Sequence, residues 1–296
     1  MKIRLASIED GIDNVGFRKV SSYIKSIHQD TSVVYIPPGN RQDIVRVLAQ
    51  KGSCDLFDED IHAASQYLAE GDIVGVSSMT QHSSTVHKVI KSIRSINPHA
   101  YIVWGGIHPI VSPEDAIEHA DAVCTGEGEF AFEGFLELFK DGKDYTTSPG
   151  FWFRKDDGVI KNENLPLMTN EDMDNLPPLT YQDGELIYHY GKGFEPINFN
   201  DFVAYASLCY NTVWSIGCPF KCTFCGNTKF IENDDAYRRL RYSSPSTIVA
   251  EVKRAITKHP HISAVNFFDD SLLALPLDVL EEFAKLYKAE IKVPFA

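Results

Sequence analysis

The chain has 296 residues, 44% of them hydrophobic and 23% charged, a balance typical of a globular protein with one large domain or two ordinary ones. No apolar run approaches the roughly 20 residues of a membrane-spanning helix, and the N-terminus lacks a signal-peptide profile, so we expect a cytoplasmic protein without a membrane partner. The formal net charge of -13 argues against nucleic acid as the main partner, because binding to phosphates depends on lysine and arginine.

Residues 1–140 alternate between short apolar runs and segments with helical periodicity. Continuously apolar strands separated by helices indicate a parallel α/β sheet with both faces covered. Five strands and five helices therefore predict a flavodoxin-like (Rossmann-like) doubly wound domain. The strands are expected at residues 2–7, 32–36, 72–77, 100–104 and 121–124, and the helices at 20–27 (with Val20, Tyr23, Ile24 and Ile27 on one face), 58–71, 86–93, 113–120 and 129–139.

Residues 141–205 are rich in turn-forming residues and lose the helical periodicity, which predicts a linker between two domains. Within this linker, the stretch "GFWFRKDDGVIKN" is expected to form a small β element. The reason is that "DDG" suits the turn of a β-hairpin.

Residues 206–296 return to an alternation of strands and helices. Ser244 is a plausible N-cap for one helix, with Pro245 in its first turn. The pattern predicts the N-terminal part of a TIM-type (β/α) barrel, and because such a barrel closes with about eight strands, we expect the natural chain to continue beyond residue 296. The expected elements are strands at 211–216 and 263–268, helices at 243–259 and 276–288, and a third strand that begins at 291.

Three cysteines, Cys218, Cys222 and Cys225, lie in one short loop with the spacing C-x3-C-x2-C, after an expected strand. In a reducing compartment, clustered thiols are metal-binding or catalytic rather than a disulfide framework. A cubane [4Fe-4S] cluster takes four thiolates, so three would leave one iron open to another ligand. A closed zinc site is the alternative, but it needs a fourth ligand: Cys209 lies at the opposite end of the strand and His259 is far along the chain.

The stretch "GCPFKCTFC" resembles at every position the C-x3-C-x-Φ-C signature of radical S-adenosylmethionine (SAM) enzymes, with Phe224 as the aromatic residue. The resemblance implies that the three cysteines bind a [4Fe-4S] cluster and that SAM chelates the fourth iron. Reduction would then cleave SAM to a 5'-deoxyadenosyl radical that abstracts hydrogen from the substrate. Phe224 would pack near the adenine, although a place in the core is equally open to it.

The stretch "VNFFDDSLL" is similar to the end of the second barrel strand in one large branch of that family. The resemblance implies that Asp269 or Asp270 accepts hydrogen bonds from the amino group or the ribose hydroxyls of SAM. Helix capping or loop solvation is the other role open to this pair.

Three loops are expected at the carboxyl ends of the parallel strands in the first domain, where doubly wound domains bind their ligands. They are "SSMTQHS", "GGIHP" and "TGEGE". Ser77, Ser78 and Thr80 offer hydroxyls, and the pair Gly105 and Gly106 allows a bulky ligand to approach the backbone.

The order of these loops, ahead of the cysteine loop, resembles the cobalamin (B12)-dependent radical SAM family over nearly the whole chain. The stretch "WGGIHPIVSPEDAIEHADAVCTGEGEFAF" and the linker are both very similar to segments of that family. The resemblance implies a cobalamin site formed by Ser77, Ser78, Thr80, Gly105, Gly106, His108, Gly126, Glu127 and Gly128. One feature departs from other cobalamin proteins: the D-x-H-x-x-G loop is missing, so we expect no histidine below the cobalt, although His82 or His108 could approach it.

The resemblance implies an enzyme that methylates an unactivated carbon or phosphorus in a small molecule or peptide, supplied with electrons by a one-electron reductant such as flavodoxin or ferredoxin. Ring formation or oxidative rearrangement without methyl transfer is an alternative with the same cofactors. An RNA methylthiotransferase would need further cluster cysteines near the N-terminus, where only Cys54 and Cys124 occur. A cobalamin-binding sensor or carrier with a structural cluster is the third alternative.

Overall fold

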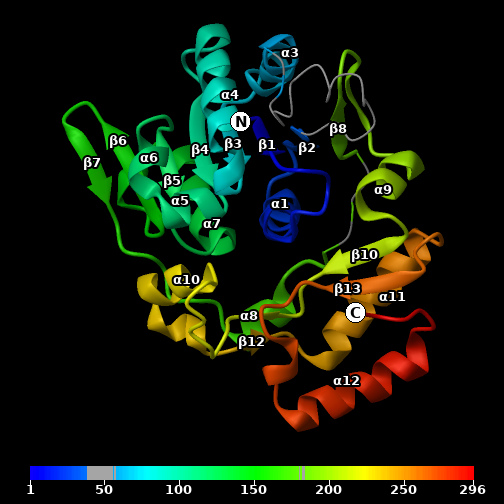
Figure 1. The fold of residues 1–296 in the computed structure, drawn as a ribbon. Coiled ribbons are helices and arrows are strands. Elements are labelled where there is room, and N and C mark those ends of the chain that lie inside the picture. Colours follow the sequence, from blue (N-terminus) through cyan, green and yellow to red (C-terminus); the bar gives the residue numbers. More distant parts are fainter. Residues whose placement is uncertain (39–55, 57, 180, 182–183) are drawn as a thin grey trace. The chain divides into compact units, whose positions relative to one another are not determined.

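The computed structural model describes residues 1–38, 56, 58–179, 181 and 184–296, and these fall into two compact units (Figure 1). The first unit contains residues 1–165 and 182–205, and the second contains residues 166–181 and 206–296. Among the described helices, none is both long enough and apolar enough to cross a bilayer.

A nine-stranded sheet forms the centre of the first unit, in the order β7-β6-β5-β4-β3-β1-β2-β8-β9. Its five middle strands are parallel and follow the flavodoxin-like order 2-1-3-4-5, which confirms the predicted fold class. These strands are β1 (Ile3–Ser7), β2 (Thr31–Tyr35), β3 (Ile73–Ser77), β4 (Tyr101–Gly105) and β5 (Ala122–Cys124).

Helices cover both faces of this sheet, as a continuously apolar parallel sheet requires. One face packs on α1 and α7, and the other on α3, α4 and α6. The predicted first helix forms and begins five residues earlier than expected. On it Ile24 is buried, Ile27 at the end is 45% exposed, and Phe17, which was not predicted, is buried in a T-shaped ring contact with Tyr35 of β2. The bounds are α1 (Val15–Ile27), α3 (Asp58–Leu68), α4 (Ser83–Ile96), α5 (Ile107–Val111), α6 (Pro113–Ile117) and α7 (Gly128–Lys140).

The segment expected to be a linker contributes two hairpins to the edges of the sheet. The hairpin predicted from "DDG" forms from β6 (Phe151–Lys155) and β7 (Gly158–Lys161) and extends the sheet antiparallel to β5. The second hairpin, β8 (Leu186–His189) and β9 (Gly193–Pro196), adds to β2 and was not predicted. Its short strands give little periodicity, and it is held by a tertiary contact: the Tyr188 hydroxyl donates to Asp60 of α3 at 3.0 Å.

The second unit contains two parallel strands, β10 (Cys209–Thr212) and β13 (Ala264–Phe267), followed respectively by the cysteine loop and by α12. The strand expected at 211–216 is broken, because residues 215–216 form β11 and pair antiparallel with β12 (Arg241–Tyr242). Phe295 forms a parallel bridge with Val265, as expected for the start of a third strand. The helices are α8 (Asn170–Asn175), α10 (Asn227–Asn233), α11 (Pro245–Lys258) and α12 (Leu277–Glu290), while α9 (Phe199–Ala206) joins the two units in sequence.

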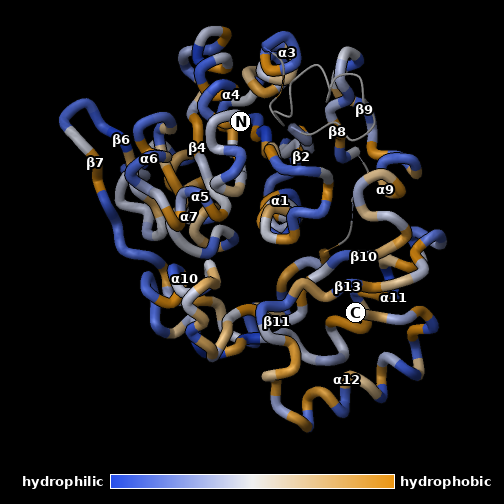
Figure 2. Tube along the Cα trace, in the orientation of Figure 1, coloured by the Kyte–Doolittle hydropathy of each residue, from blue (hydrophilic) through white to orange (hydrophobic). Residues whose placement is uncertain are grey.

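Helices α11 and α12 close the core of the second unit. Ser244 caps α11 by accepting a hydrogen bond from the Thr247 backbone, which confirms the predicted cap. Along α12, hydrophobic and hydrophilic residues alternate at helical spacing (Figure 2). Phe283 on its inner face lies 4.6 Å from the ring of the fully buried Trp214.

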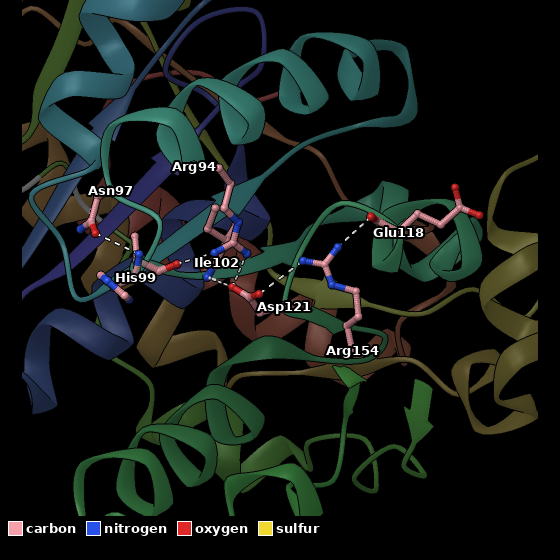
Figure 3. Close-up of polar contacts among 8 residues, drawn as sticks. Arg94, Asn97, His99, Ile102, Glu118, Asp121 and Arg154 are labelled. Carbon is pink, nitrogen blue, oxygen red and sulfur yellow. Dashed lines mark hydrogen bonds and ion pairs between the residues drawn. The ribbon is translucent and has the colours of Figure 1, made fainter. Parts of the chain in front are cut away.

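Charged side chains form a cluster of ion pairs and hydrogen bonds at the amino ends of β4 and β5 in the first unit (Figure 3). Asp121, directly before β5, accepts a hydrogen bond from the Ile102 backbone at 2.7 Å. The same carboxylate forms ion pairs with Arg94 of α4 at 2.5 Å and with Arg154 of β6 at 3.5 Å. Arg154 also donates to the Glu118 carbonyl at 2.9 Å. One carboxylate therefore connects a helix and three strands.

We expect Asp121→Ala to lower the free energy of unfolding by about 2 kcal/mol, because two half-buried guanidinium groups and a backbone N–H lose their partner. Urea denaturation of the purified chain measures this loss. Asp141→Ala is the matched control, since Asp141 is exposed and its carboxylate bonds to the exposed Lys143. Equal midpoints for the two variants would show that the Asp121 cluster contributes nothing to stability.

Candidate functional site

The carboxyl ends of the central strands lie level with one another. In the register of the sheet, Ser7 of β1 pairs with Ser77 of β3, and Ser77 pairs with Gly105 of β4. The loops that follow these three strands therefore start from one edge of the sheet, which is where a doubly wound domain binds its ligand. The loop after β5 carries the last of the predicted residues, Gly126, Glu127 and Gly128.

The backbone conformation and the close neighbours of residue 106 both require a glycine at this position. The φ of Gly106 is +90°, which side chains rarely adopt, and a Cβ there would lie 2.7 Å from Ser77 Oγ and 2.9 Å from the Ser78 backbone. Gly126 and Gly128 are also close to neighbours, because a Cβ would meet Asn164 at 3.1 Å and Val20 at 3.0 Å. These three glycines are explained by packing within the protein.

Gly105 is different. A Cβ at this position would meet only Cys124 Cβ among the described residues, at 3.9 Å, an ordinary van der Waals distance. Its φ is not in the left-handed region. Neither a left-handed backbone conformation nor packing explains this glycine, and its contact with a ligand stays a prediction.

The predicted hydroxyls and His108 are joined by hydrogen bonds. Ser78 is fully buried, accepts from Trp104 Nε1 at 3.1 Å, and its carbonyl accepts from the His108 backbone at 3.1 Å. The buried His108 ring lies 2.8 Å from Asp115 through Nε2 and 3.4 Å from the exposed Thr80 through Nδ1. Both ring nitrogens of His108 therefore face protein groups.

His82 is also buried. Its Nε2 lies 3.0 Å from the Gln81 side chain and 3.8 Å from the carboxylate of Asp10. Both histidines that could approach a cobalt thus have protein contacts.

Glu9 is a residue of this edge that the sequence prediction missed. It lies in the loop after β1 and accepts a hydrogen bond from Asn14 Nδ2 at 2.7 Å, while Asn14 caps α1. Burial raises the pKa of Glu9 from its ordinary 4.5 to about 8, the backbone of Met79 lowers it, and the nearby Asp10 raises it further. The sequence feature that could have indicated this residue is its place between Ile8 and Ile12, because both of these isoleucines are fully buried.

The cysteine loop of the second unit begins at a constrained glycine. Gly217 has a φ of +107°, and a Cβ there would lie 2.6 Å from the Arg239 carbonyl and 2.7 Å from the Tyr237 carbonyl. The next residue, Cys218, donates its backbone N–H to the Tyr237 carbonyl at 3.1 Å. A short 3-10 helix (Asp235–Arg238) therefore holds the start of the loop.

All three cysteines of this loop carry free thiols. Cys218 is buried, Cys225 is partly buried and Cys222 is exposed, and the Cys225 backbone donates to the Cys222 carbonyl at 3.1 Å. Phe224 between them is 91% exposed, so its ring does not face the core. Three free thiols on one tight turn suit a three-thiolate metal site that keeps one position open.

The acidic pair after β13 braces the same loop. Asp269 accepts hydrogen bonds from the Trp214 backbone at 3.0 Å and from both the backbone and the hydroxyl of Ser215 at 2.5 Å. Asp270 accepts from the Tyr237 hydroxyl at 3.0 Å. Both carboxylates therefore act within the protein as anchors of the chain around the cysteines, and a contact with SAM stays a prediction.

A family model for the B12 binding domain matches residues 3–136 of the chain. Curated relatives include an uncharacterized methyltransferase from Pyrococcus horikoshii, 25% identical over 68% of this chain and 40% of the relative. An anaerobic magnesium-protoporphyrin IX monomethyl ester cyclase from Cereibacter sphaeroides is 26% identical over 67% of this chain and 29% of its own. The chain thus matches less than half the length of these relatives.

Two solved structures share the fold of the chain. The radical SAM methyltransferase TsrM from Kitasatospora setae, solved with tryptophan substrate and a SAM analogue, has a TM-score of 0.66 and 14% identity over 98% of this chain and 51% of its own. The cobalamin-dependent SAM radical enzyme OxsB, solved with aqua-cobalamin and SAM, has a TM-score of 0.66 and 17% identity over 99% of this chain and 38% of its own. The B12-binding domain and this shared fold confirm the predicted resemblance to cobalamin-dependent radical SAM enzymes.

We expect Glu9→Gln to change how stability depends on pH. Between about pH 4.5 and pH 8 the native protein retains a proton on Glu9 that the unfolded chain has released. The stabilisation from this proton is fully present below the unfolded-state pKa of 4.5 and is lost as the pH rises through the folded-state pKa of about 8. Glu9→Gln lacks this titration, so the free energy of unfolding of the variant should rise by about 3.5 kcal/mol relative to that of the parent from pH 5 to pH 8.

Urea denaturation of both proteins at several pH values tests this prediction. A free-energy difference that stays constant from pH 5 to pH 8 would contradict it, because Glu9 would then titrate alike in the folded and unfolded states.

Proposed function

We propose that this chain methylates an unactivated carbon or phosphorus of a small molecule or peptide. Its residues 3–136 match the family model for the B12 binding domain, and its fold is that of cobalamin-dependent radical SAM enzymes. The observation that carries the proposal is the cysteine loop: three free thiols in the order of the radical SAM signature, on the same chain as a B12-binding domain. Its cofactors would be a [4Fe-4S] cluster, SAM and cobalamin.

In this proposal Cys218, Cys222 and Cys225 hold three irons of the cluster. The cluster with SAM would supply a radical that removes hydrogen from the substrate, and cobalamin would supply the methyl group. Gly217 and Asp269 keep the cysteine loop in place through the contacts described above. The exposed ring of Phe224 is available to cover the adenine of SAM.

In the first unit, the edge formed by the loops after β3, β4 and β5 is the proposed cobalamin site. Gly105 leaves room for the corrin, and Ser77 and Thr80 offer hydroxyls to its polar substituents. The contacts of His82 and His108 with protein groups support a cobalt without a histidine ligand.

Ring formation is the second candidate function, favoured by the likeness to magnesium-protoporphyrin IX monomethyl ester cyclases. Turnover products separate the two: methylation yields S-adenosylhomocysteine together with 5'-deoxyadenosine, whereas a cyclase would release 5'-deoxyadenosine alone. In either case a one-electron reductant such as flavodoxin or ferredoxin would serve the cluster, in the reducing cytoplasm where free thiols persist.

An RNA methylthiotransferase is disfavoured by the net charge and by Cys124. Burial raises the pKa of the Cys124 thiol to about 12, so this thiol is a poor source of the thiolate that a second cluster needs. Cys54, the other candidate, lies outside the described residues.

Cluster loading tests the proposal. After anaerobic reconstitution, the parent chain should hold about four irons and four sulfides, together with one cobalamin. Gly217→Ala should lose most of the iron, because its Cβ would collide with two backbone carbonyls. Gly226→Ala is the matched control from the same loop, since a Cβ there meets nothing within 4 Å. Bound zinc and no corrin in the parent would overturn the proposal.

We expect Gly105→Ala to weaken cobalamin binding about tenfold or more, a loss of about 1.4 kcal/mol, while the thermal unfolding of the chain stays unchanged. The added methyl group meets no close protein neighbour, so its effect should fall on the ligand. Titration with hydroxocobalamin, followed by absorbance, measures the affinity. Unchanged affinity in a folded variant would place the corrin away from Gly105.

A further inference from the structure

Three potential metal ligands come together beside the sheet of the first unit, apart from every residue assigned above. His87 lies in the second turn of α4, Asp115 lies in α6, and His119 follows α6 by two residues. Asp115 and His119 are four residues apart, and the helical turn continues to His119 through its backbone bond to Ala116. Their side chains therefore share one side of this turn, toward α4.

The ligand atoms of these three residues lie within 4.8 Å of one another. His87 Nε2 is 3.4 Å from Asp115 Oδ2, close to the separation of two ligands on one tetrahedral ion. The imidazole rings of His87 and His119 stack with centroids 3.7 Å apart and planes 25° apart. Stacking at this distance favours two neutral rings over two charged ones, and neutral imidazole is the form that binds a metal. Because the lone pair of each ring nitrogen lies in the plane of its ring, the two rings must turn out of this stack to share one ion.

The Nε2 atom of His87 has the Asp115 carboxylate 3.4 Å away but makes no hydrogen bond of acceptable geometry with it. This atom is buried, and no other group among the described residues makes such a bond with it. The Trp104 and His87 rings make a T-shaped contact with centroids 5.4 Å apart, which restricts the orientation of the His87 ring. Such buried polar atoms are rare in native proteins, and an ion at this point would satisfy it.

A further histidine orients the carboxylate. The buried His108 lies 2.8 Å from Asp115 Oδ2 and is itself held by Thr80. Metal ligands in proteins are commonly fixed by such outer contacts. Asp115 is exposed and both ligand histidines are partly exposed, so an ion can reach the cluster from solvent.

We propose that His87, Asp115 and His119 form a binding site for a divalent transition-metal ion, with Zn²⁺ as the best match. Two imidazole nitrogens and one carboxylate oxygen are a ligand set found in zinc sites that keep a fourth position for water. The bound ion would connect α4 to α6, the helices before and after β4. None of the three proposed metal ligands is a residue on which the proposed function rests, although His108, which contacts Asp115, lies in α5 after β4.

The test uses the full chain with Cys218, Cys222 and Cys225 changed to alanine, so that the thiols cannot bind zinc. After treatment with a chelator, titration of Zn²⁺ against a chromophoric indicator should show one site. His87→Gln and His119→Gln should each weaken it about tenfold or more. His99→Gln is the matched control, because His99 is an exposed histidine of the same unit outside the cluster.

Two further measurements test the same site. Zn²⁺ should raise the thermal unfolding midpoint of the chain with the three alanine substitutions but not that of the same chain with His119→Gln, whose fold is checked by circular dichroism. X-ray absorption at the zinc edge should show nitrogen and oxygen neighbours only. Absence of a stoichiometric site, or equal affinity in His99→Gln and His119→Gln, would overturn the proposal.

Discussion

The parallel register of β1, β3 and β4 is the constraint on which the first unit depends. It aligns Ser7, Ser77 and Gly105 at one edge of the sheet, so loops separated by tens of residues begin side by side. The hydrogen bonds among Ser78, Trp104 and His108 then connect the loop after β3 to the loop after β4. The proposed cobalamin site at this edge would be a consequence of strand pairing, because its residues come from several loops.

Backbone geometry has the same importance in the second unit. Gly217 approaches two carbonyls of the 3-10 helix, and Asp269 holds the backbone on the other side of β11. These contacts are made by residues about 20 and 50 positions away in sequence. The three thiols therefore lie on a loop whose conformation depends on distant segments, as the proposed cluster site would require.

Much of the fold was predictable because its signal is local. Apolar strands and amphipathic helices of the first domain were found at nearly the right residues, and so was the cap at Ser244. The misses have a common cause. The β8–β9 hairpin and the burial of Phe17 depend on partners in other elements, Asp60 and Tyr35, which periodicity within a segment does not reveal.

The sequence by itself determined the doubly wound domain, the spacing of three cysteines, and the resemblance to cobalamin-dependent radical SAM enzymes. Only the tertiary structure separated the glycines that packing requires, such as Gly106, from Gly105, which packing does not explain. It also decided the anchoring role of Asp269, the partly buried carboxyl of Glu9 with its raised pKa, and the contact of His87 with His119. The physical reason is that spacing along a chain encodes local conformation, whereas desolvation and contact arise between segments that only folding brings together.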